Sequence, residues 1–279
     1  MLRNYFKVAF RNIFRHKFYS FINIFGLTIG ISVSLLISFY VFDELSYDTF
    51  HEDADRIYQV HMKGVLQGKP FNGANSCSPF AAASVEEVPG IEEAIRINLW
   101  RDVVLRYEDN IYTEKIVLVA DSNFFEFFTF KLKEGNPNDI LNEVNQIILT
   151  ETSAKKYFGY EAGKSESPLG KMVEFGTNKT NCEVVGIVED PPTNSHFVFD
   201  MIYSMVSWDT SRRPDWTSNN LHTYVKLNDQ ANVDAVQESV SAMSDAHVGP
   251  EILKYIGVSL EEWRAAGGDY GYYIQPMLD

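Results

Sequence analysis

The stretch that decides the architecture is FYSFINIFGLTIGISVSLLISFYVF, residues 18–42, which contains no Asp, Glu, Lys, Arg or His. A helix needs about 20 apolar residues to cross about 30 Å of hydrocarbon. A signal peptide has a shorter apolar core, of about 7–15 residues, and ends at a small-residue cleavage site; this stretch has neither feature. We therefore predict an uncleaved transmembrane helix over residues 18–42.

Basic residues, and no acidic ones, precede this helix. They are Arg3, Lys7, Arg11, Arg15 and Lys17. Basic residues close to a span stay in the cytoplasm, so we expect a cytoplasmic N-terminus and an extracytoplasmic location for everything after Asp43. Four of these cations recur every four residues between apolar ones. Residues 1–17 are therefore predicted to form a basic amphipathic helix on the cytoplasmic membrane face; the alternative is a plain topogenic charge cluster.

The rest of the chain is acidic and carries no recognisable catalytic or metal-binding motif. Outside the first 17 residues, 19 basic residues stand against 38 acidic ones, a net charge of −19, which argues against nucleic acid as a partner. Cys77 and Cys182 either pair or stay free. Ser195-His196 is an adjacent pair rather than a triad, and GYEAGKS (159–165) lacks the spacing of a phosphate-binding loop. We predict a non-enzyme with no catalytic residue, cofactor or metal.

Alternating and helical patterns predict the elements beyond residue 43. A loop is expected at 64–75, and the helix 78–88 is expected to be capped by Ser76 or Ser78. A hairpin turn is expected at Glu108-Asp109-Asn110. The remaining helices are expected at 152–159, capped by Thr150 or Thr152 and ended by Gly159, and at 233–247, capped by Asn232. The predicted strands are 57–62, 91–100, 103–115, 116–121, 145–150, 172–176, 182–192, 197–205, 222–227 and 271–277.

These elements suggest an α+β domain in which a strand–helix–strand pattern appears twice. The two copies are separated by a mainly β unit at about 121–195, so the simplest account is a repeat split by an inserted subdomain. That unit begins with five Phe between residues 124 and 130. Such a cluster either binds an apolar cargo or, more commonly, forms the core.

Three segments together resemble a known family. They are FDELSYDTFHEDADRIYQV (42–60), VADSNFFEFFTFKLKEGNP (119–137) and VVGIVEDPPTNSHFVFD (184–200), with NQIILTETSAKKYFG (145–159) and PLGKMVEFG (168–176) between them. Their order resembles the MacB-like periplasmic core domain of the MacB/FtsX/LolC group of ABC transporter permeases, over nearly the whole chain. The resemblance implies a porter-like subdomain in two halves, 43–120 and 196–279, with a sabre-like β subdomain inserted at 121–195.

The resemblance also implies a function. Such permeases have four membrane helices, dimerise in the bacterial inner membrane and work with a cytoplasmic ABC ATPase. They couple ATP hydrolysis to movement of the periplasmic domain, for export or extraction of a substrate. Membrane lipid and a periplasmic or outer-membrane protein are further expected partners. A helix continuing through residues 43–47 would transmit motion to the domain; the alternative is a simple tether.

This sequence departs from the family pattern because only one hydrophobic stretch is long enough to span a membrane. We therefore expect an N-terminal fragment of a permease or a truncated reading frame. The alternative from another class is a membrane-anchored extracytoplasmic sensor or binding domain of a signalling protein. Three further membrane helices beyond residue 279 would favour the permease, whereas a cytoplasmic signalling module would favour the sensor.

Overall fold

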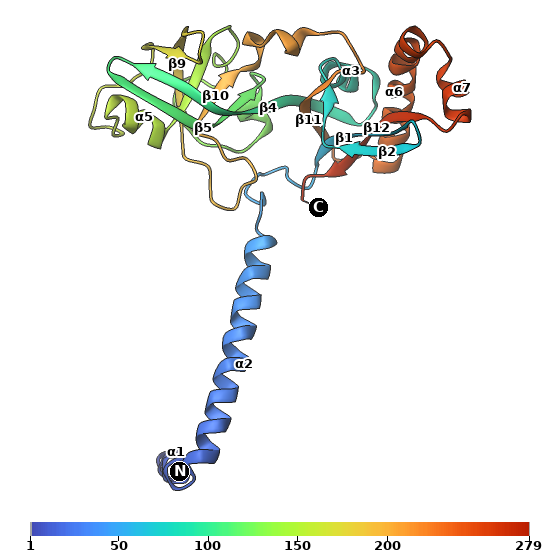
Figure 1. The fold of residues 1–279 in the computed structure, drawn as a ribbon. Helices are drawn as coiled ribbons and strands as arrows, with labels where there is room; N and C mark the ends of the chain where they lie inside the picture. Colours follow the sequence, from blue (N-terminus) through green and yellow to red (C-terminus); the bar gives the residue numbers. More distant parts are fainter. Residues whose placement is uncertain (1, 279) are drawn as a thin grey trace. The chain divides into compact units, whose positions relative to one another are not determined.

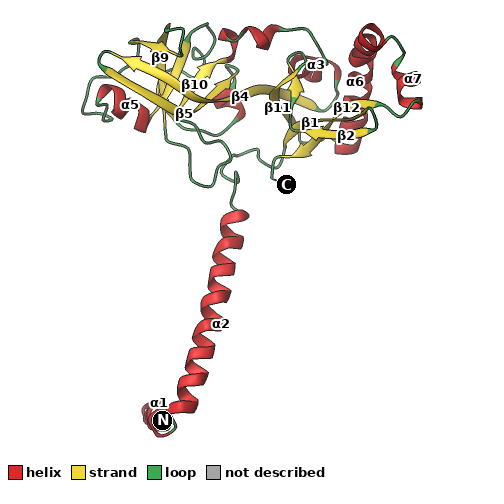
Figure 2. Cartoon of the chain, viewed as in Figure 1, coloured by secondary structure: helices red, strands yellow, loops and turns green. Residues whose placement is uncertain are grey.

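The computed structural model describes residues 2–278 and forms two compact units, residues 1–47 and 48–279. Figure 1 labels the helices and strands, and Figure 2 shows that the first unit is helical and the second mixed. The helices are α1 Leu2–Arg15, α2 Lys17–Glu44, α3 Phe80–Glu87, α4 Phe124–Phe127, α5 Glu151–Phe158, α6 Val233–Ile256 and α7 Leu260–Ala265. The strands are β1 Ile57–Leu66, β2 Lys69–Gly73, β3 Ser76–Cys77, β4 Ile91–Tyr107, β5 Asn110–Ala120, β6 Leu132–Glu134, β7 Gln146–Thr150, β8 Met172–Phe175, β9 Thr180–Val188, β10 Met201–Ser204, β11 Asn219–Leu227 and β12 Asp269–Pro276.

The first unit consists of α1 and α2. Among the described residues, α2 is the one helix whose length and composition suit a membrane span. Two of its polar side chains bond back to the helix: Thr28 Oγ1 donates to the Ile24 carbonyl at 2.7 Å and Ser38 Oγ to the Ser34 carbonyl at 2.8 Å. Regular helix ends at Glu44, and hydrogen-bonded turns replace the expected helical continuation through Tyr47.

The second unit is built on a single mixed sheet of 12 strands. Its main path runs β12-β1-β11-β4-β5-β10-β7-β9-β6. Two neighbouring pairs, β5 with β10 and β7 with β9, are parallel, and the other pairs are antiparallel. This mixed α/β fold, together with the N-terminal apolar helix, confirms the predicted fold class.

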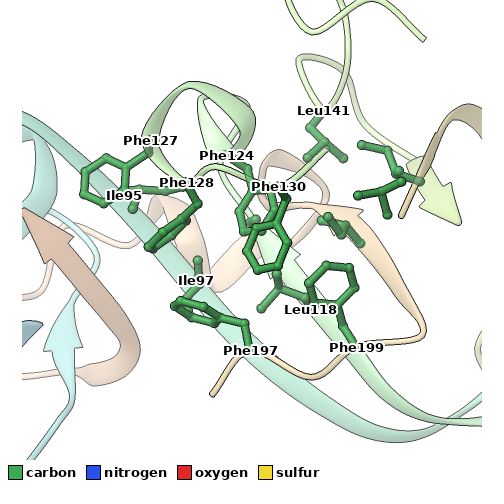
Figure 3. Packing of buried hydrophobic residues seen from close by; sticks show 14 of the residues in the cluster. Ile95, Ile97, Leu118, Phe124, Phe127, Phe128, Phe130, Leu141, Phe197 and Phe199 are labelled. Atoms are coloured by element: carbon green, nitrogen blue, oxygen red, sulfur yellow. The ribbon is translucent and has the colours of Figure 1, made fainter. Parts of the chain in front are cut away.

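Buried side chains of the second unit form three clusters. The first contains Phe124, Phe127, Phe128 and Phe130 together with Phe197, as Figure 3 shows. The second gathers residues of β1, β12 and α6, and the third gathers residues of β7, β9 and α5. Strand β4 contributes to all three, through Ile97 to the first, Ile91 to the second and Leu105 to the third.

The Phe-rich run is part of the core, because four of its five Phe side chains are buried and pack against one another and against Phe197. The two cysteines are free and lie in different clusters, Cys77 in the second and Cys182 in the third. Burial raises the pKa of each thiol to about 12. Both thiols are therefore protonated and unreactive at neutral pH.

Several predicted elements are wrong in their limits. The expected loop at 64–75 is a hairpin, in which β1 pairs with β2 around a turn at Gln67-Gly68. Both turn residues have positive φ, 52° and 74°, as a two-residue hairpin turn requires. The three strands predicted between 91 and 121 are two, β4 and β5, although the turn between them lies at Glu108-Asp109 as expected.

The helix ends agree with the prediction where a side chain caps them. Thr150 accepts from the Ser153 N–H at the start of α5, and Gly159 ends that helix with φ of 64°. Asn232 caps α6, which continues past the predicted end to Ile256. The capping of α3 was predicted wrongly: Pro79 occupies the N-cap position, while Ser76 and Ser78 bond to β11 and to Ser211. Helix α7 was not predicted.

Candidate functional site

The candidate site lies where the folded domain begins, directly after the membrane helix in the chain. We call residues 48–56 the root segment. At its beginning and middle it contacts two distant segments, around Thr129 and around Ser195. These three places belong to the three sequence stretches 42–60, 119–137 and 184–200, which carry the family resemblance. We call the set Asp48, His51, Thr129, Ser195 and His196 the root clamp.

Asp48 fixes the first residue of the domain. Its backbone adopts φ of 55°, and its N–H donates to the Asn194 carbonyl at 2.9 Å. Its buried carboxylate accepts from the His196 N–H at 3.1 Å and from Ser195 Oγ at 3.2 Å, and it also contacts His196 Nδ1. Burial raises the pKa of Asp48, but hydrogen bonds and electrostatic attraction from His196 outweigh it, so the pKa lies below its usual value.

A chain of hydrogen bonds leads from Asp48 into the sheet. A His196 tautomer that donates a hydrogen bond from Nδ1 to the Asp48 carboxylate keeps Nε2 as an acceptor. Tyr224 on β11 lies 3.1 Å from that nitrogen and accepts from Gln59 Nε2 at 2.9 Å. Tyr224 and Gln59 are register partners on adjacent strands. The clamp is thereby joined to β11 and β1.

His51 is the second fixed point of the root segment. It is 3% exposed and its ring lies 5.2 Å from each of the Phe128 and Phe130 rings. Its Nδ1 accepts from the Thr129 N–H at 3.1 Å, while its Nε2 has no hydrogen-bond partner in the described part of the chain. Burial lowers the pKa of His51 to about 4, so the ring is neutral at physiological pH.

Ion pairs fix the end of the root segment. Arg56 contacts Asp53 at 2.6 Å and Glu92 at 2.9 Å, and it donates to the Leu227 carbonyl at 2.9 Å. The hydrogen bond that Arg56 donates to Asp53 raises the pKa of Arg56 further above its usual range. Nearby, Lys226 is 5% exposed and lies 3.1 Å from Glu93. The root segment is therefore fastened at its beginning, middle and end.

The clamp has no catalytic geometry. Ser195 Oγ donates to Asp48 rather than to His196, so the pair lacks the nucleophile–base contact that a triad needs. Across the described residues, no group of three His, Cys, Asp or Glu side chains could hold a metal. The Gly163-Lys164-Ser165 sequence lies in a loop, with Ser165 bonded to Glu161. What the arrangement can do is hold the chain rigidly.

Sequence reasoning did not find the clamp as a site. It singled out the three segments only through the family resemblance, and it treated Ser195-His196 as a chance pair. The available signal was a His close to aromatic residues in two of the segments, His51 and His196, and the Phe-rich run around Thr129 in the third. That signal does not show which segments meet, because the meeting depends on the order of strands in the sheet.

One comparison with known proteins identifies the family. A model of the MacB-like periplasmic core domain matches residues 20–243. A permease domain from Porphyromonas gingivalis has 24% sequence identity and a TM-score of 0.67, covering 81% of this chain and 92% of that one; the two share their fold. No curated protein matches the chain.

Two other solved structures are more distant. The periplasmic region of MacB from Actinobacillus actinomycetemcomitans has 15% identity and a TM-score of 0.46, covering 78% of this chain and 88% of that one. The extracellular domain of the noncanonic ABC-type transporter YknZ from Gram-positive bacteria has 15% identity and a TM-score of 0.48, with coverages of 77% and 99%. The family model covers most of the apolar helix α2 and most of the sheet domain. On that basis, this chain belongs to the family of the MacB-like periplasmic core domain.

Proposed function

We propose that the chain is the N-terminal part of a permease subunit of an ABC transporter of the MacB/FtsX type. A cytoplasmic ABC ATPase partner hydrolyses ATP, and the membrane helix passes the resulting movement to the extracytoplasmic domain for export or extraction of a substrate. The observation that carries the proposal is the root clamp. A Gly/Ser linker would behave as a flexible coil and absorb such movement, whereas here the first residues of the domain are buried and hydrogen-bonded.

We propose the following organisation for the domain. A porter-like subdomain is formed by 43–120 and 196–279, and a sabre-like subdomain by 121–195. In support, the second core cluster contains only residues of the two outer ranges. The third cluster combines residues of 121–195 with Leu105 and Val117 of the β4–β5 hairpin and with Met201, Tyr203, Met205 and Leu221, so the inserted part packs on strands of both outer ranges.

We also propose the membrane, the orientation and the partners of the protein. The subunit pairs with a second copy in the bacterial inner membrane, with its N-terminus in the cytoplasm and its main domain in the periplasm, and it contacts a periplasmic or outer-membrane protein. Support comes from the basic residues before α2 and from the family. The chain itself performs no catalysis, since hydrolysis belongs to the ATPase.

The test interrupts the mechanical connection. Fluorophores at Lys17→Cys and Lys179→Cys, in the full chain with its co-purified ATPase, report a distance change when ATP is added. A Gly-Ser insertion after Tyr47 should abolish that change while leaving the domain folded. The control is the same insertion at Gln67-Gly68, in the β1–β2 turn, which should preserve it. An unchanged response after the first insertion would refute the coupling, and failure to recover any ATPase would refute the partner.

A further inference from the structure

The elbow between α1 and α2 contains a notch that the proposed function does not use. His16 separates the two helices with φ of −118° and ψ of 58°, outside the helical region, and Figure 1 shows α1 nearly end-on, so that it lies across α2. The notch has a volume of about 430 Å³. Polar and apolar side chains of both helices line it, among them Asn12, Ile13, His16, Ser20, Asn23 and Ile24.

The polar side chains of the notch have unused hydrogen-bonding capacity. Within the described residues, none of the Asn12, His16, Ser20 and Asn23 side chains makes a hydrogen bond, whereas Thr28 and Ser38 of the same α2 bond to carbonyls one turn back. An amide left unpaired near hydrocarbon costs free energy. Asn23 lies six residues beyond Lys17, about 9 Å along the helix at about 1.5 Å per residue. The notch therefore favours an occupant that accepts hydrogen bonds.

The charge around the notch identifies the kind of acceptor. Lys7, Arg11, Arg15 and Lys17 are exposed and form no ion pair with any described residue. Basic residues beside a membrane span attract anionic lipids. The exposed Phe6, Phe10 and Phe14 of α1 suit burial at the lipid interface. An anionic group at headgroup depth would meet both the uncompensated cations and the unpaired amides.

We propose that the notch binds the phosphate of an anionic phospholipid headgroup. The Asn12 and Asn23 amides and the Ser20 hydroxyl donate hydrogen bonds to phosphate oxygens, and the neighbouring cations supply the charge. Ile13 and Ile24 contact the glycerol and the upper part of the acyl chains. One lipid is thereby held in the elbow between the interfacial helix and the span. This inference is independent of the proposed transport function.

Native mass spectrometry of the full chain released from nanodiscs tests the site, with phosphatidylglycerol and phosphatidylcholine as probes. We expect retained phosphatidylglycerol on the wild type and about tenfold less on Asn12→Leu/Asn23→Leu, since two charge-assisted hydrogen bonds are lost. The matched control is Thr28→Leu/Ser38→Leu, which removes the same number of polar groups from α2 outside the notch and should retain lipid normally. Tryptophan fluorescence should show a folded domain in all variants.

Other occupants give different results. If the Asn12→Leu/Asn23→Leu variant retains phosphatidylglycerol while Lys7→Gln/Arg11→Gln does not, the attraction is general charge and the notch is no site. If millimolar inorganic phosphate displaces the lipid from the wild type, the ligand is free phosphate. If the notch variant keeps its lipid but loses the co-purifying ATPase, the notch is a protein contact. Each of these three outcomes overturns the proposal.

Discussion

At the residue scale, Asp48 anchors the first residue of the domain through hydrogen bonds to its buried carboxylate. Replacing it by Asn keeps the shape but weakens the bonds to Ser195 and His196. We expect Asp48→Asn to lower the free energy of unfolding by about 1–3 kcal/mol, the usual cost of disturbing a buried charged hydrogen-bonding group. Urea unfolding of the full chain measures it. Asp55→Asn, exposed in the same root segment, is the control, and an equal loss in both variants would contradict the role assigned to Asp48.

His51 makes the stability of the domain depend on pH. Its folded-state pKa of about 4 lies below the usual 6.5, so the unfolded chain binds a proton that the folded chain excludes. Its contribution is fully present above pH 6.5 and is lost as pH falls from 6.5 to 4. The loss amounts to about 3 kcal/mol at 1.36 kcal/mol per pH unit.

The measurement is the free energy of urea unfolding at several pH values between 4 and 7, for the wild type and for His51→Phe. Phe removes the titrating group and fits an aromatic environment, although it leaves the Thr129 N–H without its acceptor. The variant should be less stable at pH 7 and should show a shallower dependence on pH. The same slope in both proteins would exclude His51 as the cause.

At the element scale, a side chain closes the free edge of the sheet. Among the described strands, β12 pairs with β1 alone. On its other edge the Gln237 amide of α6 accepts from the Ile274 N–H at 2.8 Å and donates to the Tyr272 carbonyl at 3.3 Å. This amide occupies the place of a neighbouring strand. It blocks an edge that could otherwise pair with another chain.

Replacement of Gln237 by Ala should therefore expose the Ile274 amide. We expect hydrogen exchange at Ile274 to become faster by about tenfold, the equivalent of roughly one lost hydrogen bond. Gln237→Glu keeps an acceptor for that N–H and should retain much of the protection. Unchanged exchange in the Ala variant would show that α6 covers the edge without this bond.

At the scale of the whole molecule, the three core clusters share strands and should unfold together. Strands β4 and β11 each supply residues to all three clusters. The four tryptophans divide between two of them: Trp100 and Trp208 pack against the third, and Trp216 and Trp263 belong to or pack against the second. Fluorescence can therefore follow each cluster separately.

In Trp100→Phe/Trp208→Phe the remaining tryptophans report on the second cluster, and in Trp216→Phe/Trp263→Phe they report on the third. In each variant we expect the fluorescence midpoint to coincide with the midpoint of the whole domain, because one sheet crosses both clusters. Circular dichroism provides the reference transition for each variant. If the fluorescence and circular dichroism midpoints separate within one variant, the parts of the domain that contain the second and third clusters are independent folding units.

The sequence by itself determined the features that depend on local physics. The span over 18–42 follows from length and apolarity, the caps of α5 and α6 from Thr150 and Asn232, and the fold class from the order of elements and the family resemblance. The hairpin at 64–75 was missed because Gln67-Gly68 is a weak turn signal and because its first strand, β1, is stabilised by pairing with β12, which is distant in the sequence.

Only the tertiary structure decided the root clamp. Asp48, Thr129 and His196 lie far apart in the sequence, and nothing in their local patterns shows that they meet. They meet because β1, β5 and β10, the strands adjacent to them in the chain, belong to one sheet. There burial lowers the pKa of His51, and the hydrogen bonds and electrostatic attraction from His196 lower the pKa of Asp48 despite its burial.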